Sequence, residues 1–360
     1  MSNDLQHSVQ RYRRYSLYIL LWMLTGLVGL LIPSGVSGLS NTVIAQAESA
    51  QPATERGSNE WANFWREVRR GTAGYTAVTG QERTVLIQNG GENWRTFRAG
   101  MIITCGARLM AFVLFMAGFF HVINGTQKIK QGRSGLTIAR WTLFERVMHW
   151  YVAILFLILA LTGLSLLYGR TVLIPLLGKE HFAAYAALAK DLHNYLGPCF
   201  AAGLLLMLIV WFRDNLPIKA DFEWAKTAGG MWGSGHPPAD RMNAGEKLMY
   251  WQFAVFGIAL AASGFVLDFP NIGQTRAVMQ WAHVIHVVFA IGMIVTVMGH
   301  MYMGLIGVEG VLEGMIKGRV DIHWAEQHHN LWYYQQLKQG VKPESTPEHR
   351  QATPLGRAGT

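Results

Sequence analysis

Two histidines that share one face of a strongly apolar helix constrain this chain more than any other feature. His286 and His300 lie in the segment WAHVIHVVFAIGMIVTVMGHMYM. At about 1.5 Å per residue they lie about 21 Å apart along the axis, and steps of about 100° bring the second side chain within about 40° of the first. The apolar segment predicts a membrane span, and imidazole inside a bilayer indicates function. The spacing favours two stacked b-type haems that carry electrons across a membrane.

The composition is that of an integral membrane protein. Apolar residues make up 51% of the 360 residues and charged residues only 15%, against about 25% charged in a typical soluble protein. The formal net charge of +9 would suit nucleic acid, but no basic stripe with interleaved aromatic residues occurs. The basic residues concentrate in alternate loops, as the positive-inside rule expects. We therefore exclude nucleic acid as a partner and expect membrane lipid.

The two cysteines exclude some forms of redox chemistry within this chain. Cys105 and Cys199 belong to no CxxC or CxxCH pattern. Covalent c-type haem and an iron–sulfur cluster are therefore not expected here. Both thiols are predicted to be buried in apolar surroundings.

The N-terminal region predicts export. Residues 1–47 carry a basic start, an apolar run over 15–32 and the small-x-small site Ala45-Gln46-Ala47. This pattern indicates a secretory signal peptide, with an uncleaved anchor as the alternative because the apolar run is long. Residues 48–104 are predicted to form an extracytoplasmic segment with a helix near 60–70 and a strand at 84–88.

Apolar runs predict the fold class, an all-α integral membrane protein. Five spans long enough to cross the bilayer are expected at about 105–125, 147–168, 190–212, 247–268 and 279–307. Residues 105–126 give an additional N-terminal transmembrane helix, and residues 143–310 give a four-helix dihaem cytochrome b bundle. Residues 311–360 form a tail, amphipathic over 323–337 and disordered over 341–360.

The charge of the loops predicts orientation. The loops at 127–146 and 213–247 are rich in lysine and arginine, whereas the loops between them carry few such residues. The basic loops should therefore be cytoplasmic. This places the mature N-terminus in the periplasm and the C-terminus in the cytoplasm, in a bacterial inner membrane.

Four histidines pair by depth in the predicted bundle. His149 and His300 lie toward the cytoplasmic side, and His193 and His286 lie toward the outer side. A bis-histidine haem needs ligands from facing helices at matching depth, so the last span would supply one ligand to each haem. The two irons would then be about 20 Å apart. The alternative for each single histidine is a hydrogen-bonded residue at the membrane interface.

The other histidines are not expected to ligate haem. His283 is turned about 100° away from the face of His300 and is predicted to be a rim or proton-handling residue. His121 has no obvious partner. His181 and His236 fall in predicted loops, and His323, His328 and His329 fall at the surface of the tail.

Some neighbours of these histidines allow two readings. Glycines on the same helices are compatible with close helix packing or with contact to a flat macrocycle. They are Gly163, Gly197, Gly292 and Gly299. Arg146 would pair with a haem propionate or, as we favour, anchor its helix at the lipid headgroups.

Six segments carry a resemblance to a known family. Within residues 143–337 they are FERVMHW, DLHNYLGP, NAGEKLMYW, HVVFAIGMIVTVMGHMYM, EGMIKGRV and WAEQHHNLWY. In their order and spacing the chain resembles the gamma subunit, the cytochrome b, of respiratory formate dehydrogenase. The N-terminal part, with VLIQNGGENWR and the additional span, resembles the longer form of this subunit found in many bacteria.

The resemblance implies two b haems and a place in an electron-transfer complex. It implies that His149 and His300 ligate the cytoplasmic-side haem and that His193 and His286 ligate the outer one. The implied partners are a molybdenum- or tungsten-dependent catalytic alpha subunit, which oxidises formate, and an iron–sulfur beta subunit. Electrons would pass from the iron–sulfur subunit through both haems to a membrane quinone.

The resemblance also implies a quinone site beside the cytoplasmic-side haem. Asn243 and Gly245, in RMNAGEK, stand at the matching positions, for menaquinone or ubiquinone. An amide and a backbone group there would hydrogen-bond a quinone carbonyl, and Glu246 and Lys247 would be available to relay protons. The residues alone favour an ordinary helix start with Asn243 as its N-cap.

Two other functions remain open. A related dihaem cytochrome b of a hydrogenase or thiosulfate reductase would use the same haem ligands with a different partner. A haem-free anchor or transporter would use intramembrane histidines for proton coupling. The pairing of the histidines by depth, and the lack of paired broken helices or an inverted repeat, argue against the second.

Overall fold

The computed structural model describes residues 60–70, 89–227, 229 and 237–346. The predicted signal peptide, the predicted strand at 84–88 and His236 lie outside the described residues. The chain divides into two units, Met1–Cys105 and Gly106–Thr360, which are described separately.

The described part of the first unit is helical. Helix α3 covers Glu60–Arg70, α4 covers Asn89–Thr96, and the π-helix η1 covers Phe97–Ile102. Helix α3 confirms the helix predicted near 60–70. It ends on two arginines, whose charge is favourable at the negative end of a helix dipole.

Five helices in the described residues are long and apolar enough to span a membrane, as predicted. They include α5 (Ile103–Asn124), α6 (Leu143–Tyr168), α7 (Leu173–Trp211), α9 (Ala244–Asp268) and α10 (Arg276–Tyr302), which continues as the π-helix η3 (Met303–Gly307). The chain is therefore a multi-pass membrane protein. The helix starts are locally encoded, because Thr142 and Asn243 each form a capping box with a glutamate three residues later.

Helix α7 is longer than the sequence analysis predicts. It begins at Leu173 rather than near residue 190, with non-helical torsions at Gly178 (φ 79°). Its 39 residues form two helical segments joined by a kink at Gly178, and the segment after the kink is itself longer than the roughly 30 Å of hydrocarbon requires. The prediction relied on hydropathy, which stops at charged residues, whereas the alanine-rich stretch AAYAALAK continues the helix. His181 therefore lies in a helix, and its assignment to a loop was wrong.

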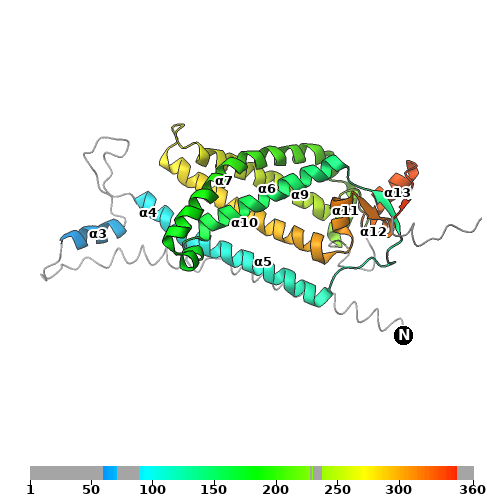
Figure 1. Cartoon of the computed structure of the whole chain (residues 1–360), viewed down its shortest axis with the longest axis horizontal. Helices are drawn as coiled ribbons and strands as arrows, with labels where there is room; N and C mark the ends of the chain where they lie inside the picture. Colours follow the sequence, from blue (N-terminus) through cyan, green and yellow to red (C-terminus); the bar gives the residue numbers. More distant parts are fainter. Residues whose placement is uncertain (1–59, 71–88, 228, 230–236, 347–360) are drawn as a thin grey trace, which may run out of the picture. The chain divides into compact units, whose positions relative to one another are not determined.

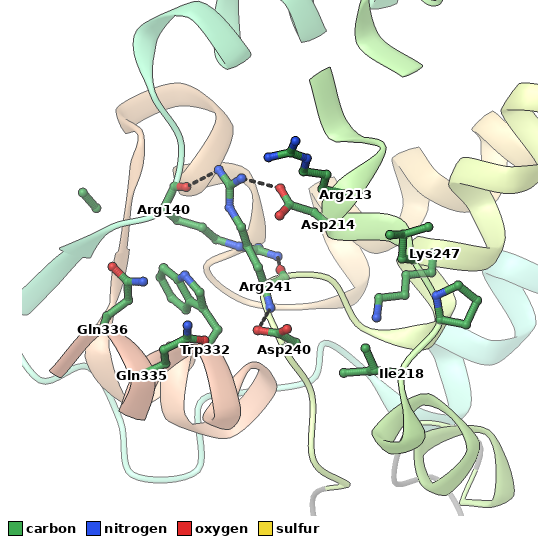
Figure 2. Close-up of a pocket in the computed structure, with 13 residues that line it drawn as sticks. Arg140, Arg213, Asp214, Ile218, Asp240, Arg241, Lys247, Trp332, Gln335 and Gln336 are labelled. Carbon is green, nitrogen blue, oxygen red and sulfur yellow. Dashed lines mark hydrogen bonds and ion pairs between the residues drawn. The ribbon is translucent and has the colours of Figure 1, made fainter. Parts of the chain in front are cut away.

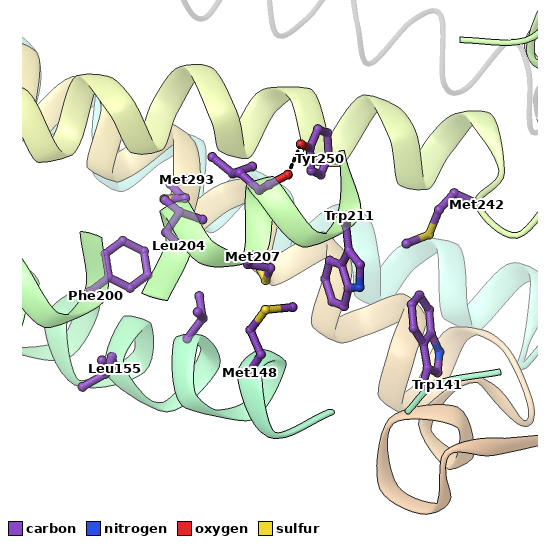
Figure 3. Packing of buried hydrophobic residues seen from close by; sticks show 12 residues of the cluster. Trp141, Met148, Leu155, Phe200, Leu204, Met207, Trp211, Met242, Tyr250 and Met293 are labelled. Carbon is purple, nitrogen blue, oxygen red and sulfur yellow. Dashed lines mark hydrogen bonds between the residues drawn. The ribbon is translucent and has the colours of Figure 1, made fainter. Parts of the chain in front are cut away.

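Helices α6, α7, α9 and α10 pack in succession (Figure 1). Helix α6 lies along α7, α7 contacts α9, and α9 lies along α10. Their common core includes Met148, Leu204, Met207 and Met293 (Figure 3). Gly257 permits the close approach of α9 to α7, because a Cβ there would stand 2.1 Å from the side chain of Leu204. Many large apolar side chains point outward, as expected of helices whose solvent is lipid.

The loops and the tail meet at one end of these helices. We call this the basic end, and among the described residues it comprises 125–142, 212–227, 229, 237–243 and 308–346. Its sheet has the order β2-β1-β3, formed by Arg319–Asp321, Leu136–Ala139 and Glu344–Ser345. All pairs are antiparallel, with Ile138 opposite Val320. The helices at this end are α8 (Lys219–Lys226), α11 (Val311–Lys317), α12 (Ile322–His328) and α13 (Asn330–Lys338).

One expectation for the tail was wrong. The region 341–360 was predicted to be disordered, yet residues 341–346 include strand β3. In the stretch 323–337, predicted to be amphipathic, Trp324 and Trp332 are buried in a second apolar core with Ile138 and Val320. A small sheet therefore closes this end of a mostly helical fold.

Arg241 joins three segments at the basic end. Its guanidinium donates to Glu145 of α6 at 2.7 Å and to Asp214 after α7 at 2.5 Å. Trp211 also donates to Glu145, at 3.1 Å. Figure 2 shows Arg241 between Arg140 and Asp214 in a pocket of about 740 Å³. None of the six predicted ligand residues lines this polar pocket.

The Arg241 contacts predict a large stability effect. In Arg241→Met, the Glu145 carboxylate, which is 8% exposed, would lose its cationic partner. We expect this to cost about 3 kcal/mol in the free energy of unfolding. The measurement is denaturant-induced unfolding in detergent micelles. Arg213→Met is the control, because Arg213 is exposed on the same pocket and should change stability by less than about 0.5 kcal/mol. Equal effects of the two substitutions would contradict this account.

Candidate functional site

The structure brings two of the predicted histidines together near the basic end. His149 lies in the second turn of α6, and His300 lies in the last turn of α10. Their ring centroids are 6.1 Å apart, with an interplanar angle of 61°. The Nδ1 atom of His149 is buried and has no hydrogen-bond partner among the described residues.

The other two predicted histidines meet farther along the bundle. His193 of α7 and His286 of α10 have ring centroids 6.0 Å apart, with an interplanar angle of 73°. Both Nδ1 atoms face hydroxyl groups, that of Thr162 at 2.9 Å and that of Ser263 at 3.2 Å. The two pairs are those predicted from depth.

The geometry of both pairs fits two imidazoles on opposite sides of one metal ion. Two metal–nitrogen bonds of about 2.0 Å, with about 1 Å of ring at each end, span about 6 Å between centroids. Among the described residues, no three His, Cys, Asp or Glu side chains gather to hold a metal ion by themselves. Each histidine pair therefore offers two ligands to a metal ion, which suits an iron whose other ligands come from a macrocycle.

The neighbouring glycines differ in what lies next to them. A Cβ at Gly292 would meet Phe256 at 3.0 Å, which supports close helix packing. A Cβ at Gly163 would stand 3.1 Å from the ring of His193, so this glycine makes room for a candidate ligand. A Cβ at Gly197 or Gly299 would have no atom of another described segment within 4 Å, which leaves space beside both helices.

Arg146 has a role that the sequence analysis did not predict. Its guanidinium donates to the carbonyl of Ile316 at 2.5 Å, near the end of α11. A cation at the carboxyl end of a helix is favourable. Arg146 therefore joins α6 to α11.

Several other residues differ from expectation. His121 packs edge-on against Tyr302, with centroids 6.1 Å apart, and so has a neighbour. His329 is 1% exposed, so its assignment to the surface was wrong. Cys199 is exposed and Cys105 is half-buried, whereas both were predicted to be buried.

Asn243 adopts the local role that its sequence favours. Its side-chain oxygen accepts a hydrogen bond from the amide of Glu246 at 2.9 Å, as an N-cap of α9. A Cβ at Gly245 would stand 3.0 Å from the Trp224 ring, so this residue must be small. Lys247 forms a buried ion pair with Asp221 at 2.9 Å.

Glu246 connects this helix start to a buried network. Arg140 donates to Glu246 at 3.2 Å, and the His329 Nε2 atom lies 3.9 Å from the same carboxylate. The His329 Nδ1 atom donates to the Asp240 carbonyl at 2.7 Å. Burial first, and the positive charge of Arg140 second, lower the pKa of His329 from 6.5 to about 3. His329 is therefore neutral at physiological pH.

Sequence reasoning missed three residues of the site, Thr162, Ser263 and Gly264. A Cβ at Gly264 would stand 3.3 Å from the His286 ring, as at Gly163 beside His193. The sequence pattern that could have indicated them is a hydroxyl residue followed by glycine at the depth of His193 and His286, in LTGLS and in ASGFV. Such dipeptides are common in membrane helices, which is why the signal is weak.

Comparisons with known proteins place this chain in a family. A model of a family described as prokaryotic cytochrome b561 matches residues 140–318, which extend from α6 to α11. Cytochrome b556(Fdn), of the nitrate-inducible formate dehydrogenase of Escherichia coli K12, is 30% identical over 213 residues, or 58% of this chain and 95% of the relative. Cytochrome b556(fdo), of a formate dehydrogenase from the same strain, is 30% identical over 201 residues, covering 55% and 92%.

A third relative is more distant. The formate dehydrogenase cytochrome b556 subunit of Haemophilus influenzae is 24% identical over 198 residues, covering 53% of this chain and 80% of the relative. Helices and matches together define a membrane cytochrome b, which implies haem b as cofactor. More narrowly, the chain belongs to the family of formate dehydrogenase cytochrome b556 subunits.

The buried neutral ring of His329 predicts a pH dependence of stability. Because unfolding would allow the ring to take up a proton, stability should be complete above about pH 6.5 and fall as the pH decreases toward about 3. The slope from this group is at most about 1.4 kcal/mol per pH unit. His329→Asn, which keeps a donor for the Asp240 carbonyl, should flatten the wild-type decline. Thermal unfolding in detergent between pH 8 and pH 5 measures the stability of both proteins. If the wild type and His329→Asn lose stability in parallel as the pH falls, His329 is not the group responsible.

Proposed function

We propose that this chain is the electron-transfer subunit of a formate:quinone oxidoreductase complex, with two haems b. The proposal rests on the arrangement of α10, which carries His286 and His300 on one face. The ring centroid of each lies 6.0–6.1 Å from that of a histidine on another helix. Family membership supports both the class of cofactor and the kind of complex. Formate oxidation itself belongs to a partner subunit.

The four histidines have the role of axial ligands. His149 and His300 hold the haem near the basic end, and His193 and His286 hold the other. When bound, the haems supply one-electron carriers at two depths of the membrane. The chain supplies ligands, fixed spacing, and a low-dielectric shell of apolar helices that excludes water and tunes the redox potentials.

The basic end is the cytoplasmic side in this proposal. Lysines and arginines concentrate in the loops that meet there, and the positive-inside rule retains such loops in the cytoplasm. The His193–His286 pair then lies toward the periplasm. Residues 1–47 act as the export signal, and the partners on that side are an iron–sulfur subunit and a molybdenum or tungsten catalytic subunit.

The quinone site lies at the start of α9. The Asn243 side-chain oxygen is engaged as an N-cap, which leaves the amide group as the donor for a quinone carbonyl. Glu246, in the same turn, interacts electrostatically with His300, so this helix start lies near the basic-end pair. Gly245 keeps the surface beside Trp224 free of a side chain. Menaquinone and ubiquinone both offer the carbonyl that this site needs.

Removal of one ligand tests the ligand assignment. His300→Ala should reduce two b haems per chain to one and abolish quinone reduction, while formate oxidation with an artificial acceptor continues in the assembled complex. A pyridine haemochrome count and a reduced-minus-oxidised spectrum measure the haem. His121→Ala is the matched control and should retain both haems. Two haems in His300→Ala, or none in the folded wild-type protein, would refute the proposal.

A second substitution separates quinone binding from helix capping at Asn243. Asn243→Ser keeps an N-cap oxygen but removes the amide donor. We expect both haems and near-normal stability, with a KM for quinone raised about tenfold, since one hydrogen bond is worth about 1 kcal/mol or more. Steady-state quinone reduction by the complex measures this. An unchanged KM would leave Asn243 with a capping role alone.

A further inference from the structure

Two similar contacts support the histidines of the pair farther from the basic end. On α6, Thr162 is followed by Gly163, and both contact His193 of α7. On α9, Ser263 is followed by Gly264, and both contact His286 of α10. Each hydroxyl–glycine pair thus faces a histidine on the next long helix along the chain.

The hydrogen bonds of Thr162 determine which atom donates. Its hydroxyl oxygen lies 2.8 Å from the Ile158 carbonyl and 3.1 Å from the Leu159 carbonyl. Carbonyls only accept, and a hydroxyl has one proton, so that proton is directed into the helix backbone. The oxygen must then accept from the His193 Nδ1–H group at 2.9 Å.

Ser263 repeats this arrangement. Its hydroxyl donates to the Ala259 carbonyl at 2.6 Å and lies 3.2 Å from the Leu260 carbonyl. Its oxygen therefore accepts from the His286 Nδ1–H group at 3.2 Å. Both imidazoles carry their proton on Nδ1, which leaves the Nε2 lone pair available for a metal.

The glycines make these hydrogen bonds possible. A Cβ at Gly163 would stand 3.1 Å from the His193 Cε1 atom, and one at Gly264 would stand 3.3 Å from the His286 Cε1 atom. Such distances are tighter than ordinary van der Waals contact. A side chain at either position would push the ring away from its hydroxyl partner.

We propose that Thr162 and Ser263, each with the glycine that follows, are positioning residues for His193 and His286. They fix the Nδ1–H tautomer and the ring orientation. By accepting a hydrogen bond from the Nδ1–H group, they make the imidazole a stronger electron donor to iron. This stabilises the oxidised haem and lowers the reduction potential of the haem between the two rings. This inference rests on the proposed function.

Redox titration of the assembled complex in membranes tests the inference. Thr162→Val keeps the shape of the side chain and removes the acceptor, and Ser263→Ala removes the acceptor on the other helix. We expect each to shift the reduction equilibrium of one of the two b haems tenfold toward the reduced form. For a one-electron couple this is a rise of about 59 mV. The potential of the other haem should not change.

Two controls distinguish positioning from general packing. Thr162→Ser restores the acceptor and should restore the wild-type potential. Ser165→Ala removes a hydroxyl of α6 that bonds to Tyr185 instead of a histidine, and should leave both potentials unchanged. Loss of one haem in Thr162→Val but not in Thr162→Ser would also support the inference. Unchanged potentials in Thr162→Val and Ser263→Ala would overturn it, whereas a wild-type complex without two haems would overturn the proposed function instead.

Discussion

The structure depends on the cost of placing imidazole in an apolar helix bundle. Polar groups buried away from water need partners, and α10 carries His286 and His300 on one face toward histidines of α7 and α6. Helix α9 packs along α10 and supplies Ser263 to one ring. The two imidazoles of α10 therefore find their neighbours on three other helices, α6, α7 and α9.

Matching depth also needs helices that do not slide along one another. The basic end provides this restraint, because Arg241 joins Glu145 at the start of α6 to Asp214 after the end of α7. Arg140 joins the strand before α6 to Glu246 at the start of α9. Buried ion pairs contribute little net stability when compared with apolar packing, but they are costly to break and so favour one register. In the tail, Trp324 packs against the guanidinium of Arg140, which is buried.

The membrane-spanning helices were predictable because each is a long apolar run of sequence. The histidine pairs were predictable because the position of a histidine along its run gives its depth in the membrane. The start of α7 was not, since hydropathy does not detect a helix that continues beyond the membrane. The sheet was also missed, because Thr137 pairs with Asp321 and Glu344, and local pattern does not encode contacts so distant in sequence. His329 looked like a surface residue because its partner, the Asp240 carbonyl, belongs to another loop. The same limit applies to Thr162 and Ser263, whose partners lie on other helices.

The use of one helix for both ligands has a consequence for chain length. Between His286 and His300 a single inserted or deleted residue would turn one imidazole by about 100° and move it by about 1.5 Å relative to the other. One pair would survive and the other would be lost. Insertions in the loops at the ends of α10 would move both histidines together or neither. The fourteen-residue interval thus sets the spacing between the two histidine pairs, and loop lengths can vary without altering it.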